Sequence, residues 1–195
     1  MSPTSSATKT LMTADEFFDF VHQPQNADRW FELVRGEVIE LSSPTKPHGV
    51  VCMNVGFELT MFVRARKFGY VTSNDSGVIL THDPDTVRGP DVALYEDAAA
   101  WEELHPKYGE VPPILAVEVL SPNDRANRVL DKINDYLRTG VKLVWVIDPE
   151  LRSVTVFAPG REPLAVTRDG ELTGGDALPG LAVRVGDLFS VAGQS

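Results

Sequence analysis

The stretch Ile114 to Leu120, ILAVEVL, has the composition of a buried β-strand, but it carries a glutamate near its end, Glu118. Desolvating an unpaired carboxylate costs too much free energy for a strand to bury one alone. Glu118 must therefore be paired with a cation, protonated, or bound to a metal ion. The strand itself leaves these three alternatives open, and its neighbours in the sequence have to decide between them.

A second apolar strand, expected from Asp91 to Tyr95, also carries one carboxylate, at its start. If the two strands are neighbours, Asp91 and Glu118 repel each other unless a positive charge lies between them. The helix expected after Glu118 offers Lys132, which lies on or beside its apolar stripe and can aim at the strand end. From periodicity alone, a structural Glu118–Lys132 ion pair, or a Lys132 that extends to water, is also compatible with this pattern.

Composition narrows the class of protein. The chain has 195 residues with 43% hydrophobic and 24% charged residues, which fits one globular domain, expected at 13–195 after a disordered tail at 1–12. A single cysteine, Cys52, fits a reducing compartment, and we see neither a signal peptide nor a run of about 20 apolar residues. We therefore expect a cytoplasmic protein without a membrane span. The net charge of −10 argues against coating of nucleic acid but leaves room for a local basic groove.

The hydrophobic pattern predicts a mixed α/β domain in which helices and strands alternate, followed by a β-rich C-terminal part. A capping box, Thr13 to Glu16, starts the first helix. The expected helices are 13–23, 50–67 and a segment that Ser121 caps and that runs to 139. The expected strands are a hairpin at 31–41, then 70–80, 91–95, 114–120 and 141–147, with a polar loop at 81–90 and short strands after 151.

Several motifs occur in a fixed order: FELVRGEVIELSSPTKPHG, GPDVALY, PPILAVEVLSPNDR, DKINDYLRTGVKLVWVIDPE and LPGLAVRVGDLF. Together they resemble the Uma2 family (DUF820), a bacterial group of PD-(D/E)XK-type, restriction-endonuclease-like proteins. The resemblance covers the chain from about Thr13 to Phe189. It implies a restriction-endonuclease-like core, with a mixed central β-sheet flanked by helices and a β-rich C-terminal extension.

The resemblance also implies an activity, the Mg²⁺-dependent hydrolysis of DNA phosphodiester bonds, with Mn²⁺ as a substitute. Asp91 and Glu118 would hold the metal ion together with the backbone carbonyl of Val119. Hard oxygen ligands suit Mg²⁺, which binds a phosphate oxygen beside one or two carboxylates. The lysine of the general motif is replaced by Leu120, and the resemblance implies that Lys132 takes over its role.

Glu32 is the fourth expected member of the catalytic site, and four further residues are weaker candidates. Glu32, in the apolar context FELV, is either a further carboxylate of the site or an exposed strand charge. His48 is expected either to contact the substrate or to cap its helix. Three arginines near the expected site could bind phosphates of the substrate: Arg88, Arg125 and Arg128.

The alternative to an endonuclease is a catalytically inactive relative that binds nucleic acid or protein. A glycoside hydrolase is disfavoured, since its carboxylate pair needs no lysine and no aromatic sugar cleft is evident. Cleavage of both DNA strands by so small a domain favours a homodimer.

Overall fold

The computed structural model describes residues 11–122 and 124–191. The helices are α1 (Ala14–Val21), α2 (Lys46–Arg66), α3 (Ala126–Thr139) and α4 (Val185–Leu188), with single 3₁₀ turns at Pro24–Asn26 and Trp101–Glu103. The strands are β1 (Phe31–Val34), β2 (Glu37–Glu40), β3 (Tyr70–Ser73), β4 (Val78–Thr81), β5 (Thr86–Arg88), β6 (Val92–Tyr95), β7 (Leu115–Val119), β8 (Leu143–Asp148), β9 (Ser153–Phe157), β10 (Leu164–Val166), β11 (Glu171–Gly174) and β12 (Leu178–Arg184).

The centre of the fold is a mixed six-stranded sheet in the order β10-β9-β8-β7-β6-β3. Only β7 and β8 run parallel, and α3 connects them as a crossover helix; the other pairs in this sheet are antiparallel. A four-stranded antiparallel sheet, β2-β1-β5-β4, lies beside it, and β11 and β12 form a separate pair. The expected fold class, a mixed central sheet with flanking helices, is confirmed.

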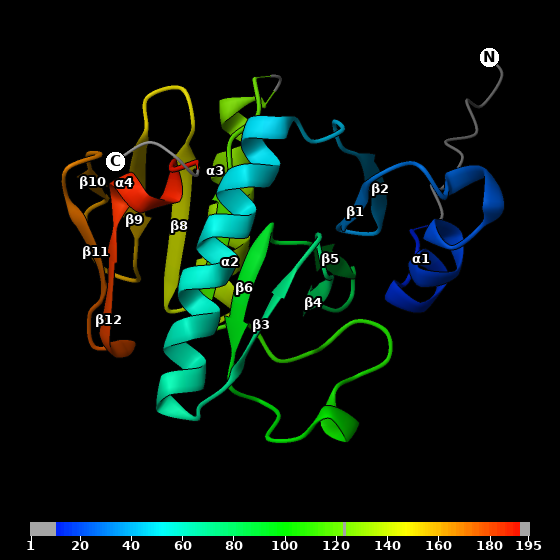
Figure 1. Cartoon of the computed structure of the whole chain (residues 1–195). Coiled ribbons are helices and arrows are strands. Elements are labelled where there is room, and N and C mark those ends of the chain that lie inside the picture. Colours follow the sequence, from blue (N-terminus) through cyan, green and yellow to red (C-terminus); the bar gives the residue numbers. More distant parts are fainter. Residues whose placement is uncertain (1–10, 123, 192–195) are drawn as a thin grey trace, which may run out of the picture.

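Two helices cover the two faces of the central sheet (Figure 1). Helix α2 buries Val51, Val55, Leu59 and Val63 against one face, together with the C-terminal β11, β12 and α4. Helix α3 buries Ile133 and Tyr136 on the opposite face. Alternation along β7 therefore directs Val117 and Val119 toward α2, and Ala116 toward α3. Glu118 shares the face of Ala116, which brings its carboxylate to α3.

The predicted hairpin and the first helix form as the sequence indicates. Arg35 and Gly36 join β1 to β2 with φ of 51° and 76°, the left-handed pair that a type I′ turn requires. A side chain at position 36 would also meet Leu11, whose Cβ lies 2.6 Å from the place of an added Cβ. Thr13 and Glu16 form the predicted capping box of α1.

The prediction of one strand from 70 to 80 is wrong. Asn74 and Asp75 adopt left-handed φ of 60° and 51°, and the turn they make separates β3 in the central sheet from β4 in the smaller one. The loop expected at 81–90 contains β5, which pairs with both β1 and β4. This strand was missed because Val87 is the only apolar residue among its three and prolines and aspartates flank it.

Two helix starts also differ from the prediction. Helix α2 begins at Lys46, not at Val50, because Thr45 accepts a hydrogen bond from the backbone N–H of His48 and acts as N-cap. Helix α3 begins at Ala126 and Ser121 does not cap it. Instead, the side chain of Asp124 accepts a hydrogen bond from the backbone N–H of Ser121 and closes a turn before the helix.

The ends of the chain bear on two further expectations. Of the expected tail at 1–12, residues 1–10 lie outside the described residues, and the N–H of Met12 donates to Gly36 O. The β-rich C-terminal part divides, since β9 and β10 extend the central sheet and β11 and β12 pair beside α2.

In the described part of the chain, none of the helices combines the length and apolarity needed to cross a bilayer.

Candidate active site

A cavity of about 270 Å³ is lined by β1, β2, the N-terminal turn of α2, the C-terminal end of β7 and the first two turns of α3. It brings together all of the residues that the sequence singled out. They come from six separate segments of the chain: Glu32, His48, Arg88, Asp91, Glu118, Val119, Arg125, Arg128 and Lys132. Asp75 and Asp124, which the sequence did not single out, also line this cavity.

Glu118 is held by two donors from one helix. Lys132 Nζ lies 2.6 Å from its Oε2, and the hydroxyl of Tyr136, one turn further along α3, donates to its Oε1 at 2.7 Å. Both donors reach the carboxylate because the spacing of four residues puts them on the inward face of α3. Pairing with a cation, the first of the three alternatives for Glu118, is therefore present in this structure, and it is compatible with a proton on the same carboxyl group.

Glu32 belongs to the same network and is not an exposed strand charge. Its side chain is 2% exposed and accepts hydrogen bonds from Arg88 at 2.7 Å and from the backbone N–H of Gly89 at 3.1 Å. Its Oε1 also lies 3.0 Å from Lys132 Nζ, so that this ammonium bridges Glu32 and Glu118. Arg88 in turn pairs with Asp135 of α3 at 2.6 Å.

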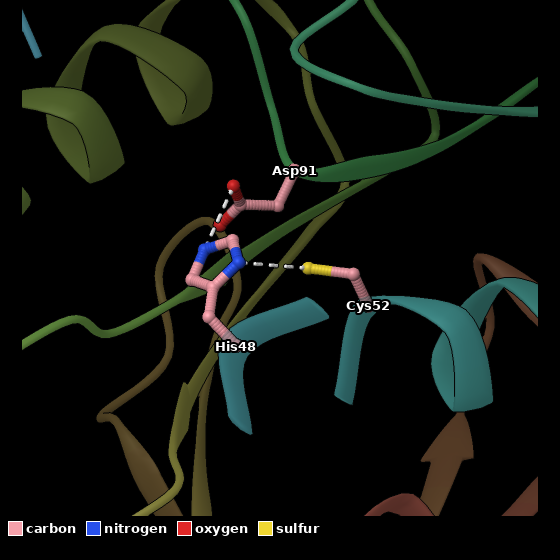
Figure 2. Close-up of side chains that lie close together, drawn as sticks. All are labelled: His48, Cys52 and Asp91. Atoms are coloured by element: carbon pink, nitrogen blue, oxygen red, sulfur yellow. Dashed lines mark hydrogen bonds and ion pairs between the residues drawn. The ribbon is translucent and has the colours of Figure 1, made fainter. Parts of the chain in front are cut away.

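Asp91 lies just before β6, where the pairing of Val92 with Val117 brings it opposite Glu118. Its Oδ2 accepts a hydrogen bond from the backbone N–H of Val119 at 2.6 Å. Its Oδ1 lies 3.2 Å from Nε2 of His48 (Figure 2). The histidine is thus a partner of Asp91, and its backbone N–H, rather than its side chain, takes part in the helix cap.

Burial and crowding of carboxylates set the protonation states. Burial raises the pKa of Glu118 to about 8, with Lys132 opposing the shift and Asp91 adding to it. Burial, with repulsion from Asp91, likewise raises the pKa of Asp75 to about 7. For Glu32, burial alone would raise the pKa, but Lys132 and Arg88 together hold it below its ordinary value. The charges of Glu118 and Glu32 raise the pKa of Lys132 against the effect of its burial, so it stays a cation.

The donor set fits a hard divalent cation. Asp91 and Glu118 offer carboxylate oxygens in one cavity, and each oxygen has a second lone pair beyond the hydrogen bond it now accepts. The raised pKa of Glu118 indicates that the protein alone does not fully stabilise its negative charge, as expected where a cation binds.

Other side chains of the cavity differ in their environment. Arg125 and Arg128 are exposed at the start of α3, whereas Arg88 is buried beneath Glu32 and paired on both sides. Their binding of phosphate stays a prediction, as does the Val119 carbonyl as a metal ligand. Leu120 lines the cavity at the position of the general motif's lysine, and Lys132 supplies the ammonium of the site from α3.

Sequence reasoning missed Asp75, Asp135 and Cys52. The segment Asn74 to Gly77 has the composition of a turn, which would have placed Asp75 at a strand end. Asp135 lies one position before Tyr136 on α3, and its contact with Arg88 depends on β5, which was not recognised. Cys52 lies one turn after His48 and accompanies it only because α2 starts earlier than predicted.

Solved structures define the class of the fold. A crystal structure from Anabaena variabilis, described as that of "a putative nuclease belonging to DUF820", is similar with a TM-score of 0.77 at 20% sequence identity. The similarity covers 91% of this chain and 97% of that one. The two chains therefore share one fold, a mixed central sheet with flanking helices.

The family follows from the sequence itself. The model of the family Uma2, described as "Putative restriction endonuclease", matches residues 15–186. The chain belongs to the Uma2 family. No curated protein matches it.

Proposed function

We propose that the protein is a Mg²⁺-dependent endonuclease that hydrolyses DNA phosphodiester bonds in the cytoplasm, with Mn²⁺ able to replace Mg²⁺. The observation that carries the proposal is the convergence of Asp91, Glu118 and Lys132 in one cavity, with Glu32 behind the lysine. Membership of a nuclease-like family supports the same class of reaction.

In this proposal Asp91 and Glu118 hold the cation, with the Val119 carbonyl as a third ligand. When bound there, the cation would supply the polarisation of the scissile phosphate and a lowered pKa of a coordinated water. The backbone N–H of Val119 keeps the Asp91 carboxylate turned toward the end of β7. The hydroxyl of Tyr136 holds the other carboxylate from the opposite side. Both ligands are therefore oriented before any substrate arrives.

Lys132 acts on the phosphate. Its ammonium is already in the cavity, 2.6 Å from Glu118, where it orients the attacking water or stabilises charge that builds on the phosphate oxygens. Glu32, fixed by Arg88 and Gly89, holds this ammonium from the far side. Arg125 and Arg128 lie at the exposed start of α3, where we expect them to bind flanking phosphates.

We also propose a homodimer formed by α2. Its outer face exposes Met53, Phe57 and Met61 by 72%, 57% and 52%. The two methionines flank Phe57 at four residues on either side, so a second copy that crosses antiparallel at Phe57 would set each methionine against the other copy's. A stripe that matches itself under a twofold rotation suits a symmetric dimer.

The alternative is a catalytically inactive relative that binds nucleic acid or protein. The test is binding of Mn²⁺, followed by the loss of the free ion's electron paramagnetic resonance signal, for the wild type, Asp91→Asn, Glu118→Gln and the control Asp176→Asn. Asp176 is an exposed carboxylate far along the chain. We expect both site variants to lose binding and the control to keep it. Equal binding by all four proteins would exclude the proposed centre and favour the inactive relative.

A further inference from the structure

His48, Cys52 and Asp91 form a cluster of a different chemical character at the edge of the same cavity (Figure 2). The thiol of Cys52 lies 3.4 Å from Nδ1 of His48, and Nε2 of that histidine lies 3.2 Å from Asp91. His48 and Cys52 are one turn apart on α2, so both side chains face the start of β6. One ligand atom from each residue lies within 4.8 Å of the other two.

These distances are close to those of ligands around one tetrahedral ion. Bonds of about 2.0–2.3 Å to nitrogen, sulfur and oxygen place ligand atoms about 3.3–3.8 Å apart. The two contacts of His48 use opposite ring nitrogens, so the ring has to turn and the cluster has to contract by about an ångström to share one ion. Two of the ligands are on one helix turn, and the third already contacts the histidine between them.

The local field also favours a cation here. Burial raises the pKa of the Cys52 thiol well above its ordinary range, and the charges of Asp91, Asp75 and Glu118 raise it further. The hydrogen bond with Asp91, and the charges of Asp91, Asp75 and Asp124, raise the pKa of His48 against the effect of its burial. A divalent cation would neutralise this excess of negative charge, and a coordinating thiol gives up its proton to the metal bond.

We propose that His48, Cys52 and Asp91 bind a soft divalent cation of the Zn²⁺ class and that this ion inhibits the hydrolytic centre by occupying Asp91. On binding, a metal–sulfur bond forms, the thiol S–H bond breaks, and its proton passes to solvent, with no change of oxidation state. Imidazole and thiolate prefer Zn²⁺, while Mg²⁺ prefers oxygen ligands, so the two sites differ in metal preference while sharing one carboxylate. The inhibition rests on the proposed endonuclease activity, but the binding does not.

The binding is tested with Co²⁺ as a spectroscopic substitute for Zn²⁺ and with Zn²⁺ itself by calorimetry. We expect a thiolate-to-cobalt charge-transfer band in the wild type that Cys52→Ser lacks. The affinity for Zn²⁺ should fall in Cys52→Ser by at least about 10–100-fold. Mutation of a residue that only hydrogen-bonds to a metal ligand already causes a loss of this size, and loss of the ligand itself should cost no less. Cys52→Ala is a second variant without the thiol and should give the same result. Melting temperatures measured in chelator show that each metal-free variant is folded. A wild type without the band, or equal Zn²⁺ affinities, overturns the site.

The inhibition is tested by adding Zn²⁺ at fixed Mg²⁺ to a plasmid-nicking assay. Cys52 does not line the cavity and is no part of the proposed hydrolytic machinery, so Cys52→Ser should nick at the wild-type rate and resist Zn²⁺. Equal inhibition of both proteins overturns the regulatory half of the proposal. If neither protein nicks DNA while the cobalt band is present, the endonuclease proposal fails and the soft-metal site stands.

Discussion

Lys132 is the residue whose surroundings say most about this site. It is largely buried, with 14% of its side chain exposed, and its ammonium contacts Glu32 at 3.0 Å and Glu118 at 2.6 Å. Sequence periodicity places it at the edge of the apolar stripe of α3, where a lysine would contribute mainly its aliphatic stem. The structure instead makes it the cation shared by two buried carboxylates.

Lys132→Ala should therefore affect both activity and stability. Removal of a positioned cation at a phosphoryl centre is expected to slow hydrolysis roughly 10²–10³-fold. Two buried carboxylates would lose their common partner, which costs about 3–5 kcal/mol of unfolding free energy. Urea unfolding and single-turnover nicking measure the two effects. A variant as stable and as active as the wild type would show that the ammonium is dispensable.

The stability of the metal-free protein should fall as the pH rises from about 4.5 to about 8. The pKa of Glu118 is raised from 4.5 to about 8, so in this window the folded protein keeps a proton that the unfolded chain releases. The raised pKa values of Asp75 and His48 act in the same direction. The slope from Glu118 alone is at most about 1.4 kcal/mol per pH unit.

The measurement is urea unfolding in chelator at several pH values between 5 and 8. Glu118→Gln, which keeps the shape of the side chain but does not ionise, should flatten the dependence. A wild-type stability that increases through this window would contradict the raised pKa of Glu118.

The residues of the site could be found from the sequence to very different extents. Glu118, Asp91 and Lys132 were evident because a charge in an apolar strand or on an apolar stripe has few explanations. Glu32 was ambiguous, since its strand is short and a single glutamate in it does not show which side is buried. Asp75 and Asp135 could not be assigned, because their contacts join segments far apart in the chain.

At the scale of helices and strands, long periodic segments were predicted well and their ends were not. Strand β7 and most of α2 and α3 carry a clear apolar pattern. Strands β3, β4 and β5 have three or four residues each, too few for alternation to be distinguished from a loop. The missed β5 matters for the site, because Arg88 at its end connects three elements.

Arg88 links β5 to β1 through Glu32 and to α3 through Asp135. Arg88→Met should destabilise the fold by about 3–5 kcal/mol, because it removes a buried cation that pairs with both Asp135 and Glu32. The matched control is Arg161→Met, which removes a pair whose side chains are 68% and 97% exposed, and it should have little measurable effect. Chemical unfolding of both variants checks this; similar midpoints would show that the Arg88 network does not hold these elements together.

For the whole molecule, the net charge of −10 does not reveal that one cavity combines lysine and arginine side chains with carboxylates. Composition could exclude a general DNA-coating role but could not locate this cavity. The exposed stripe on α2 was also hidden in the sequence, because the helix is apolar on two faces and only packing shows which one is buried.

If α2 forms the proposed dimer, Phe57→Glu should produce a monomer, since a charge would be buried at the centre of a twofold interface. Trp101→Glu, at an exposed position in the 3₁₀ turn Trp101–Glu103 and not on α2, is the control and should remain dimeric. Sedimentation velocity over a range of concentrations distinguishes the two states. A wild type that stays monomeric at high concentration would exclude this interface.

The proposed role of Glu118 as a ligand of catalytic Mg²⁺ is tested by the rate of Mg²⁺-dependent nicking of supercoiled plasmid. The wild type and Glu118→Gln are compared at equal folded concentration, with chelator as the blank and with Asp176→Asn as the control for an unrelated carboxylate. We expect the wild type and the control to nick the plasmid, chelator to abolish nicking, and Glu118→Gln to nick at least roughly 10²-fold more slowly. Equal rates for the wild type and Glu118→Gln, or nicking that persists in chelator, would contradict it.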